Sequence, residues 1–168
     1  MGTSIKVPAV EALTFEALFA KERDRLFTSL WLITRDRHEA EEVAQDAFVK
    51  VWERWERRGA PDDPTAYPFR TAMNIQRNRR RRAAVALRHT PSRQESADEL
   101  GAVEARDVVM RALGALTPSQ RAALVLMDLL DMTSTEAAAA LGVRPSTVRV
   151  LAARGRATLS AQIGASDG

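Results

Sequence analysis

Segment 40–55 carries an apolar stripe regular enough to define how the chain must fold. In its sequence, AEEVAQDAFVKVWERW, the apolar residues recur at steps of three and four: Ala40, Val43, Ala44, Ala47, Phe48, Val51, Trp52 and Trp55. This spacing is typical of an amphipathic helix that buries one face against neighbouring helices. No segment of the sequence shows the alternation expected of a half-buried strand. We therefore expect an all-α fold.

Two further helices are expected beside this one in the N-terminal half. Apolar residues recur at helical spacing through 15–33, interrupted only at Glu22. After Arg58, a glycine and two prolines predict a loop. Asp63 is placed to cap a third helix, with Pro64 at its first position, where a missing N–H costs nothing.

The third helix, expected over Thr65 to Arg82, has two unlike sides. Its core side carries apolar residues such as Phe69 and Met73. The opposite side carries a polar stripe at helical steps: Arg70, Asn74, Arg77, Asn78 and Arg81. An unstructured basic tail has no reason to keep such a stripe, so we expect a surface that binds and reads a partner. The remaining arginines of the run, Arg79, Arg80 and Arg82, are expected to hold phosphates less selectively.

Charge is distributed unevenly along the chain. Lys and Arg exceed Asp and Glu by only 25 to 22, yet 64–94 contains no acidic residue and many arginines. Segment 36–56 instead leans acidic. Surfaces of opposite sign indicate two different partners, one of them a phosphate backbone.

Two capped helices predict a helix-turn-helix in the C-terminal half. Thr133 with Glu136 three residues later forms a capping-box pattern, and Gly142 can end the short helix that follows. Pro145 then begins a second helix. In a helix-turn-helix the second helix enters the major groove, so Ser146, Thr147 and Arg149 are candidates for base or phosphate contacts. The alternative is a plain helical core with solvated arginines.

Aromatic residues divide the chain into two parts. All of them lie between Phe15 and Phe69, and periodicity stops near Pro91. We expect two small helical domains, at 10–83 and 103–162, joined by a flexible linker at 84–102. Trp52 and Phe69 match the apolar stripes and are expected in the core, whereas stacking of single-stranded bases is the alternative for aromatics near the basic stripe.

Enzymatic function has little support in the sequence. Glu42 and Asp46 share a helix face, which admits a metal site or acid–base chemistry, but there is no Cys, no glycine-rich phosphate loop and no nucleophile motif. A partner-binding face is favoured. We expect no catalytic residue, no metal and no cofactor. Neither a signal peptide nor a membrane span is evident, so a cytoplasmic protein without membrane insertion is expected.

Three ordered blocks resemble the extracytoplasmic-function sigma factors of bacterial RNA polymerase, most of all the actinobacterial kind. They are DRHEAEEVAQDAFVKVWERW, PTAYPFRTAMNIQRNRRRR and LGALTPSQRAALVLMDLLDMTSTEAAAALGVRPSTVRVLAARGRATL. The resemblance implies a subunit that binds core polymerase and promoter DNA and directs transcription initiation. Its polymerase contacts would be the clamp of the largest subunit and the flap of the second. An anti-sigma factor is a further partner that such factors commonly have.

The resemblance also implies roles for individual residues. Polymerase docking falls to Glu41, Glu42, Gln45 and Asp46. Recognition and melting of the minus-ten element fall to Arg70, Asn74, Arg77, Asn78 and Arg81, with Asn74 beside a flipped base. Recognition of the minus-thirty-five element falls to Arg144, Ser146, Thr147, Arg149 and Arg154. The family usually has Asp where Asn78 stands and a capping residue where Arg144 stands.

A stand-alone helix-turn-helix regulator that binds operator duplex without polymerase is the second hypothesis. The acidic and apolar helix at 39–55 discriminates between the two, because a simple regulator needs no such docking face.

Overall fold

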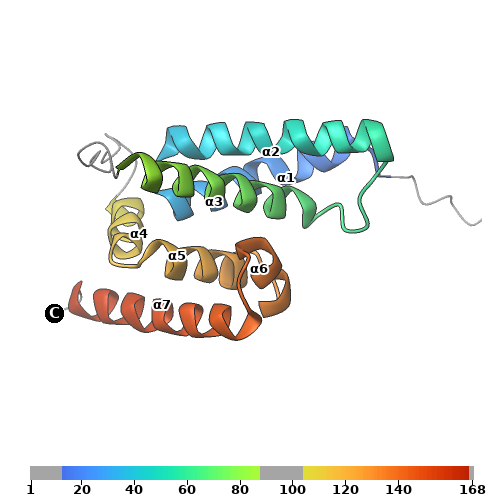
Figure 1. The fold of residues 1–168 in the computed structure, drawn as a ribbon. Coiled ribbons are helices and arrows are strands. Elements are labelled where there is room, and N and C mark those ends of the chain that lie inside the picture. Colours follow the sequence, from blue (N-terminus) through green and yellow to red (C-terminus); the bar gives the residue numbers. More distant parts are fainter. Residues whose placement is uncertain (1–12, 88–103, 167–168) are drawn as a thin grey trace, which may run out of the picture.

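The computed structural model describes residues 13–87 and 104–166, which contain helices and no strand (Figure 1). The elements in chain order are α1 (Phe15–Thr34), α2 (Arg37–Arg58), α3 (Tyr67–Leu87), α4 (Glu104–Gly114), α5 (Pro118–Leu124), η1 (Val125–Leu129), α6 (Ser134–Leu141) and α7 (Pro145–Ser166). The all-α expectation is confirmed. Most of the expected linker, 88–103, lies outside the described residues.

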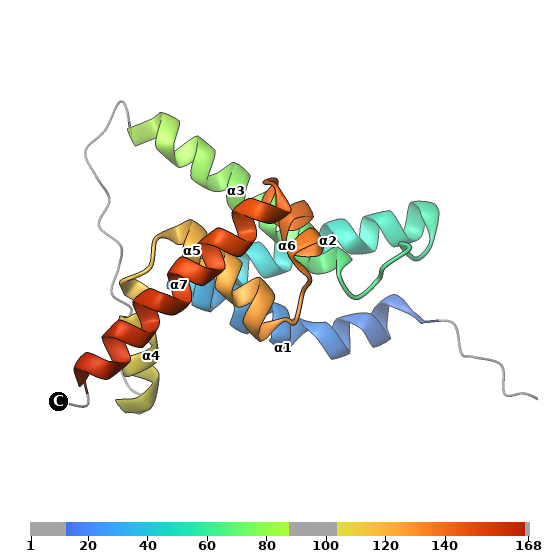
Figure 2. The ribbon, with the colours of Figure 1, turned by 90° about the horizontal axis from the view of Figure 1, so that it is seen from below.

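The helices form two layers. α1, α2 and α3 make the first layer, and α4 to α7 make the second (Figure 1). The view from below places α6 across α3 and α5 across α1 (Figure 2). Both crossings are packed, since α3 contacts α6 and α1 contacts α5 and η1. The second layer therefore covers one side of the first.

Local capping sets the helix ends of the first layer. The Thr14 hydroxyl accepts from Ala17 N at 3.2 Å, and the Asp36 carboxylate accepts from Glu39 N at 3.0 Å. The Asp63 carboxylate accepts from Ala66 N at 3.0 Å, but Ala66 lies in a turn, so this bond does not cap a helix that starts at Pro64 as expected. Segment 64–66 forms a turn before α3 begins at Tyr67, and α3 continues past the end expected at Arg82.

The second layer contains the predicted helix-turn-helix. Capping boxes are formed by Thr117 with Gln120 at α5 and by Thr133 with Glu136 at α6. Gly142 ends α6 with φ of 68°, a left-handed conformation that glycine adopts without strain. The turn leads into α7. Between α5 and α6 the chain winds as the π-helix η1, which the sequence pattern did not reveal.

One apolar core joins the layers. Leu26 and Leu30 of α1, Phe69 of α3, Leu126 of η1 and Val148 of α7 all belong to it, each no more than 1% exposed. Burial of a side chain of this size stabilises the fold by about 1.5–3 kcal/mol. The layers thus share a core rather than touching only through polar groups.

The expectation for Trp52 was wrong. Phe69 is buried as expected, but Trp52 is 49% exposed. The buried stripe of α2 consists of Ala40, Val43, Ala44, Ala47, Phe48 and Val51. α2 packs mainly against α1 and α3, and these two helices cover a narrower face than the sequence periodicity suggests.

Candidate nucleic-acid interface

The acidic residues predicted for partner binding lie together on the surface of α2. Glu41, Glu42, Gln45 and Asp46 are all exposed. They follow one another at helical steps, so their side chains present one hydrogen-bond-accepting surface. Val49 and Trp52 continue that surface towards the C-terminal end of α2, with 53% and 49% exposure. The surface therefore combines carboxylates with an apolar extension.

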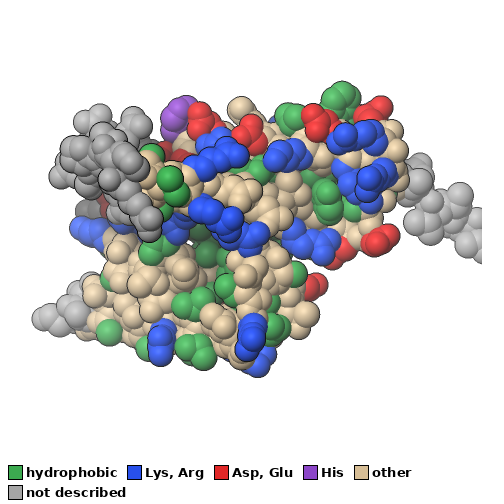
Figure 3. Space-filling model, viewed as in Figure 1, with side chains coloured by type: hydrophobic (Ala, Val, Ile, Leu, Met, Phe, Trp, Pro, Cys, Tyr) green, Lys and Arg blue, Asp and Glu red, His purple; other side chains and the backbone are tan. Residues whose placement is uncertain are grey.

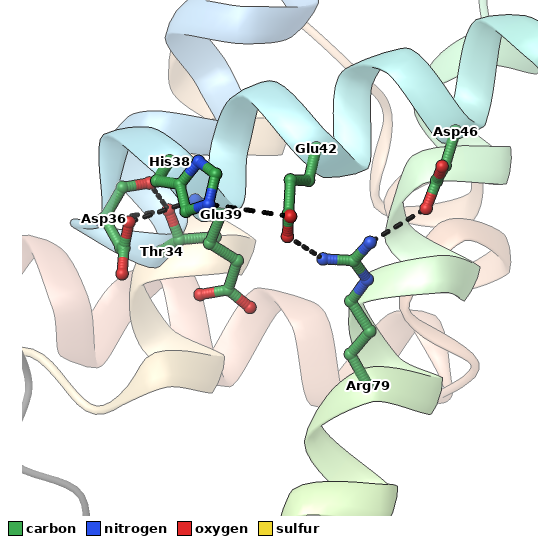
Figure 4. A network of polar contacts seen from close by, with 7 residues as sticks. All are labelled: Thr34, Asp36, His38, Glu39, Glu42, Asp46 and Arg79. Carbon is green, nitrogen blue, oxygen red and sulfur yellow. Dashed lines mark hydrogen bonds and ion pairs between the residues drawn. The ribbon is translucent and has the colours of Figure 1, made fainter.

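Arg79 ties this acidic surface to α3 (Figure 4). Its Nη1 donates to Glu42 Oε2 at 2.9 Å and its Nη2 donates to Asp46 Oδ2 at 2.8 Å. Partial burial alone would lower the pKa of Arg79, but its hydrogen bonds and charge interactions with Glu42 and Asp46 raise that pKa above the ordinary value. Arg79 therefore bonds two carboxylates, in contrast to the phosphate contact expected from the sequence.

Two further ion pairs, both within α2, involve carboxylates of this surface. Arg37 Nε lies 3.4 Å from Glu41 Oε1, and His38 Nε2 lies 3.6 Å from Glu42 Oε1. These partners are largely exposed and stand one helical turn away, so each pair contributes little to stability. They leave the carboxylates free to exchange partners.

Basic side chains follow α3 below this acidic surface (Figure 3). The five residues of the predicted stripe differ in exposure. Asn74, Asn78 and Arg81 are exposed, whereas Arg70 and Arg77 are half-buried. Arg77 Nη2 donates to Asn74 Oδ1 at 2.7 Å, which orients the Asn74 amide on the helix surface.

Arg70 and Arg77 are half-buried because they lie near the two ends of α6. The charge of Arg70 contributes to a lowered pKa at Glu136, in the first turn of α6, although hydrogen bonds from Thr133 are the larger cause. At the other end, a Cβ added to Gly142 would overlap the Arg77 guanidinium. The predicted stripe is thus partly occupied by the helix-turn-helix.

Tyr67 lies between two arginines at the start of α3. The guanidinium carbons of Arg54 and Arg70 stand 5.8 and 6.0 Å from the centre of its ring. Such contacts fix the orientation of the ring. Tyr67 is half-buried, so it remains a partly accessible aromatic beside the basic stripe.

The recognition helix is open along its expected face. All five predicted residues are exposed: Arg144, Ser146, Thr147, Arg149 and Arg154. Arg149 Nη1 donates to the Ser134 hydroxyl of α6 at 3.1 Å. Arg156 instead bonds Asp128 through two nitrogens, with Nε to Oδ2 at 2.7 Å, and so joins α7 to η1.

The described part of the chain contains neither a cluster of metal-ligating residues nor a membrane-spanning helix. Residues 13–87 and 104–166 contain no group of three or more potential metal-ligating His, Cys, Asp or Glu residues. Among the described helices, none combines the length and apolar character needed to cross a membrane. What the surface does offer is a set of carboxylates and two helices bearing arginine.

Family models and relatives agree with this arrangement. The model for Sigma-70 region 2 matches residues 18–85, and the model for Sigma-70, region 4 matches residues 106–159. The RNA polymerase sigma-E factor of Streptomyces coelicolor is 30% identical over 163 residues, which span 94% of this chain and 90% of the relative. The ECF RNA polymerase sigma factor SigM of Mycobacterium tuberculosis is 30% identical, over 93% of this chain and 80% of that protein.

Two solved structures share the arrangement of helices. CnrH in complex with the cytosolic domain of CnrY has a TM-score of 0.64 and 29% identity, over 90% of this chain and 88% of CnrH. RpoE in complex with the anti-sigma factor NepR from Bartonella quintana has a TM-score of 0.77 over 89% of this chain and 96% of RpoE. At 20% identity, the RpoE match is evidence for the fold alone.

Proposed function

Because the chain belongs to the extracytoplasmic-function sigma factors of bacterial RNA polymerase, we propose that α2, α3 and α7 divide the work of transcription initiation among them. The chain acts as a sigma factor and not as a stand-alone operator-binding regulator. Its individual surfaces are assigned below from their chemistry and exposure.

Polymerase docking is assigned to the acidic surface of α2. Glu41, Glu42, Gln45 and Asp46 are exposed, and Arg79 of α3 bonds two of them, Glu42 and Asp46. Surface carboxylates of this kind suit a basic partner helix, because opposite charges steer association and fix its register. We propose the clamp of the largest polymerase subunit as that partner, and the flap of the second subunit as the partner of the C-terminal domain.

Minus-ten recognition and melting are assigned to α3. Asn74, with its amide oriented by Arg77, is the candidate for contact with an extruded base, because an amide offers both donors and an acceptor to a base edge. Arg70, Arg77, Asn78 and Arg81 would hold the displaced strand. Arg80 and Arg82 extend this charge along the exposed end of the helix.

Minus-thirty-five recognition is assigned to the N-terminal turns of α7. Exposure of Arg144, Ser146, Thr147, Arg149 and Arg154 supports this role most directly, since a recognition helix must present these turns to the major groove. Arg149 is the candidate for bidentate contact with guanine.

The wider setting follows from these assignments. We place the minus-ten domain at 10–83, a linker at 84–102 and the minus-thirty-five domain at 103–162, in the cytoplasm. Catalysis is left to core polymerase. RpoE in the similar solved structure is bound to an anti-sigma factor, and we propose a partner of that class for this chain too.

Run-off transcription with purified core polymerase on candidate promoters tests the proposal. Promoter-dependent transcripts are expected, and Glu41→Lys should reduce them by weakening docking. Glu56→Lys, an equally drastic change at another exposed position of α2, is the matched control and should not. The proposal fails if no promoter yields a transcript while the free chain binds duplex tightly and specifically.

A further inference from the structure

An apolar side chain lies in the middle of the exposed face of α7. Val150 is 48% exposed and does not belong to the apolar core that the described residues form, whereas its neighbour Leu151 packs against that core. Val148 and Ala152 are fully buried and mark the side of α7 that faces the rest of the molecule. At about 100° per residue, Val150 points almost directly away from that side.

The residues that share the centre of this face with Val150 are small, and arginines lie to either side. Ser146 and Ala153, one turn before and one turn after Val150, are both exposed. Arg149 lies on the flank towards α6, where its Nη1 donates to a serine hydroxyl of that helix at 3.1 Å. Arg154 lies on the opposite flank. The centre of the face is therefore uncharged, and Val150 is the largest side chain on it.

The major groove offers one kind of apolar partner to such a side chain. A recognition helix that enters the groove removes the centre of its exposed face from water. Polar groups of a base edge placed against valine would lose hydrogen bonds to water without replacement, which costs free energy. The C5-methyl group of thymine is the apolar group on the base edges of this groove. A thymine opposite Val150 therefore buries two apolar surfaces together.

Valine is also a rigid side chain in a helix. Because it is β-branched, it has one strongly preferred χ1 rotamer there, and its two methyl groups are held in a fixed direction. Binding therefore costs less side-chain entropy at Val150 than at an arginine. Single exposed apolar residues are common on protein surfaces and need no role by themselves. The place of Val150 at the centre of the face assigned to duplex DNA distinguishes it from these.

We propose that Val150 is a specificity-determining residue that reads the C5-methyl group of one thymine in the minus-thirty-five element. The proposal rests on the minus-thirty-five role assigned to α7. It divides the reading of base edges by chemistry, with an apolar contact from Val150 at the centre of the face and hydrogen bonds from Arg149 at its flank. The element should therefore require a thymine near the base pair that Arg149 contacts.

Replacement of thymine by uracil in the DNA tests this contact, because it removes the methyl group and keeps the base pair. Holoenzyme assembled from the full chain and core polymerase first selects bound sequences from a library of random duplexes. Each thymine of a selected duplex, on either strand, is then replaced singly by deoxyuridine. Competition binding gives the ratio of affinities for the thymine and uracil probes. For the unaltered chain we expect a ratio of about four at one position, the equilibrium factor for burying one methyl-sized group.

Three variants of the chain assign the effect to Val150. Val150→Ala should bring the ratio at that position to about one, as in a double-mutant cycle, and alanine favours the helix, so the variant should fold. Val150→Ile keeps an apolar β-branched side chain and should retain the ratio. Val108→Ala, at an exposed apolar position of α4, is the matched control and should leave the ratio unchanged. Circular dichroism should show the same helix content in all of them.

The outcomes separate this contact from the promoter function. If the holoenzyme selects a sequence but no thymine in it is sensitive to the loss of its methyl group, the reading of thymine by Val150 is overturned and the minus-thirty-five role stands. The same conclusion follows if the ratio persists in Val150→Ala. If the holoenzyme selects no sequence at all, the promoter function itself fails and the proposal fails with it.

Discussion

The two helices assigned to promoter DNA differ in how ready they are to bind it. At the start of α7, Ser146 and Thr147 in the first turn and Arg144 just before it are all exposed. On α3, the stripe lies alongside α6, with Arg70 near its first turn and Arg77 at its C-cap. Both helices carry arginine at regular spacing. Their tertiary surroundings, not their composition, set their accessibility.

Because of this difference, α6 affects both of the proposed DNA-binding surfaces. It is the first helix of the helix-turn-helix and also the cover of the α3 stripe. On the roles proposed above, duplex recognition keeps α6 packed on α7, whereas melting is helped when α6 moves away from α3. On the same roles, the minus-thirty-five surface is already accessible, whereas Arg70 and Arg77 of the minus-ten stripe become fully accessible only when α6 moves away from α3.

The largest effect is expected at Asn74. Asn74→Ala should reduce open complexes about 30-fold, corresponding to about 2 kcal/mol for holding an extruded base. Permanganate reactivity of the melted strand measures this, alongside filter binding of the closed complex. A premelted template serves as the control and should largely restore transcription. Equal losses in closed and open complexes would contradict the flipped-base role.

Substitution of Arg149 tests the proposed role of α7, the more exposed of the two helices. Arg149→Ala should cost about 1–3 kcal/mol of discrimination at one base pair of the minus-thirty-five element. Binding to a panel of single-base variants measures it. Arg156→Ala is the control, because Arg156 bonds Asp128 and should leave base preference unchanged. Uniform weakening by Arg149→Ala would make it a phosphate contact instead.

Loss of the N-terminal cap of α6 tests the stability of this helix, which packs on both α3 and α7. Thr133→Ala removes the hydroxyl that accepts from Glu136 N and should lower the free energy of unfolding by about 1 kcal/mol. Thermal unfolding measures the change. Thr135→Ala, at an exposed position inside the same helix, should have a smaller effect. Equal effects of the two substitutions would show that the Thr133 cap does not stabilise α6.

The smallest effect concerns Asp128 and pH. The hydrogen bond from Arg156 lowers the pKa of Asp128 below its ordinary value of 3.8, so the bond adds stability above that pH. Its contribution fades as pH falls through the lowered folded-state pKa. Because both side chains are substantially exposed, Asp128→Asn should cost about 0.5 kcal/mol at neutral pH.

Urea unfolding at a series of pH values measures this contribution. The difference between the unaltered chain and Asp128→Asn should vanish in acid. A difference that persists in strong acid would assign the effect to packing and not to the ion pair.

The sequence was sufficient where structure depends on near neighbours along the chain. The capping box of Thr133, the turn at Gly142 and most of the buried stripe of α2 were predicted from residues within a few positions of one another, and each is present. Residue roles at the polymerase and promoter surfaces stay predictions.

Contacts between distant segments could not be foreseen. Arg79 belongs by sequence to a uniform arginine run, yet it alone of that run reaches Glu42 and Asp46, because α3 crosses α2 at that turn. Trp52 fits the apolar period of α2, but no neighbour extends far enough to bury it. Arg25 carries no motif at all, yet its Nη2 donates to the carbonyl of Leu130 in the second layer at 3.1 Å.

Binding of the free chain to its two DNA targets tests the difference between α3 and α7 most directly. Fluorescence anisotropy compares a minus-thirty-five duplex with a single-stranded minus-ten oligonucleotide, each with and without core polymerase. We predict that the free chain binds the duplex, and that measurable binding of the single strand requires polymerase. Equal binding of both targets by the free chain would contradict the account, in which α6 restricts access to the stripe of α3.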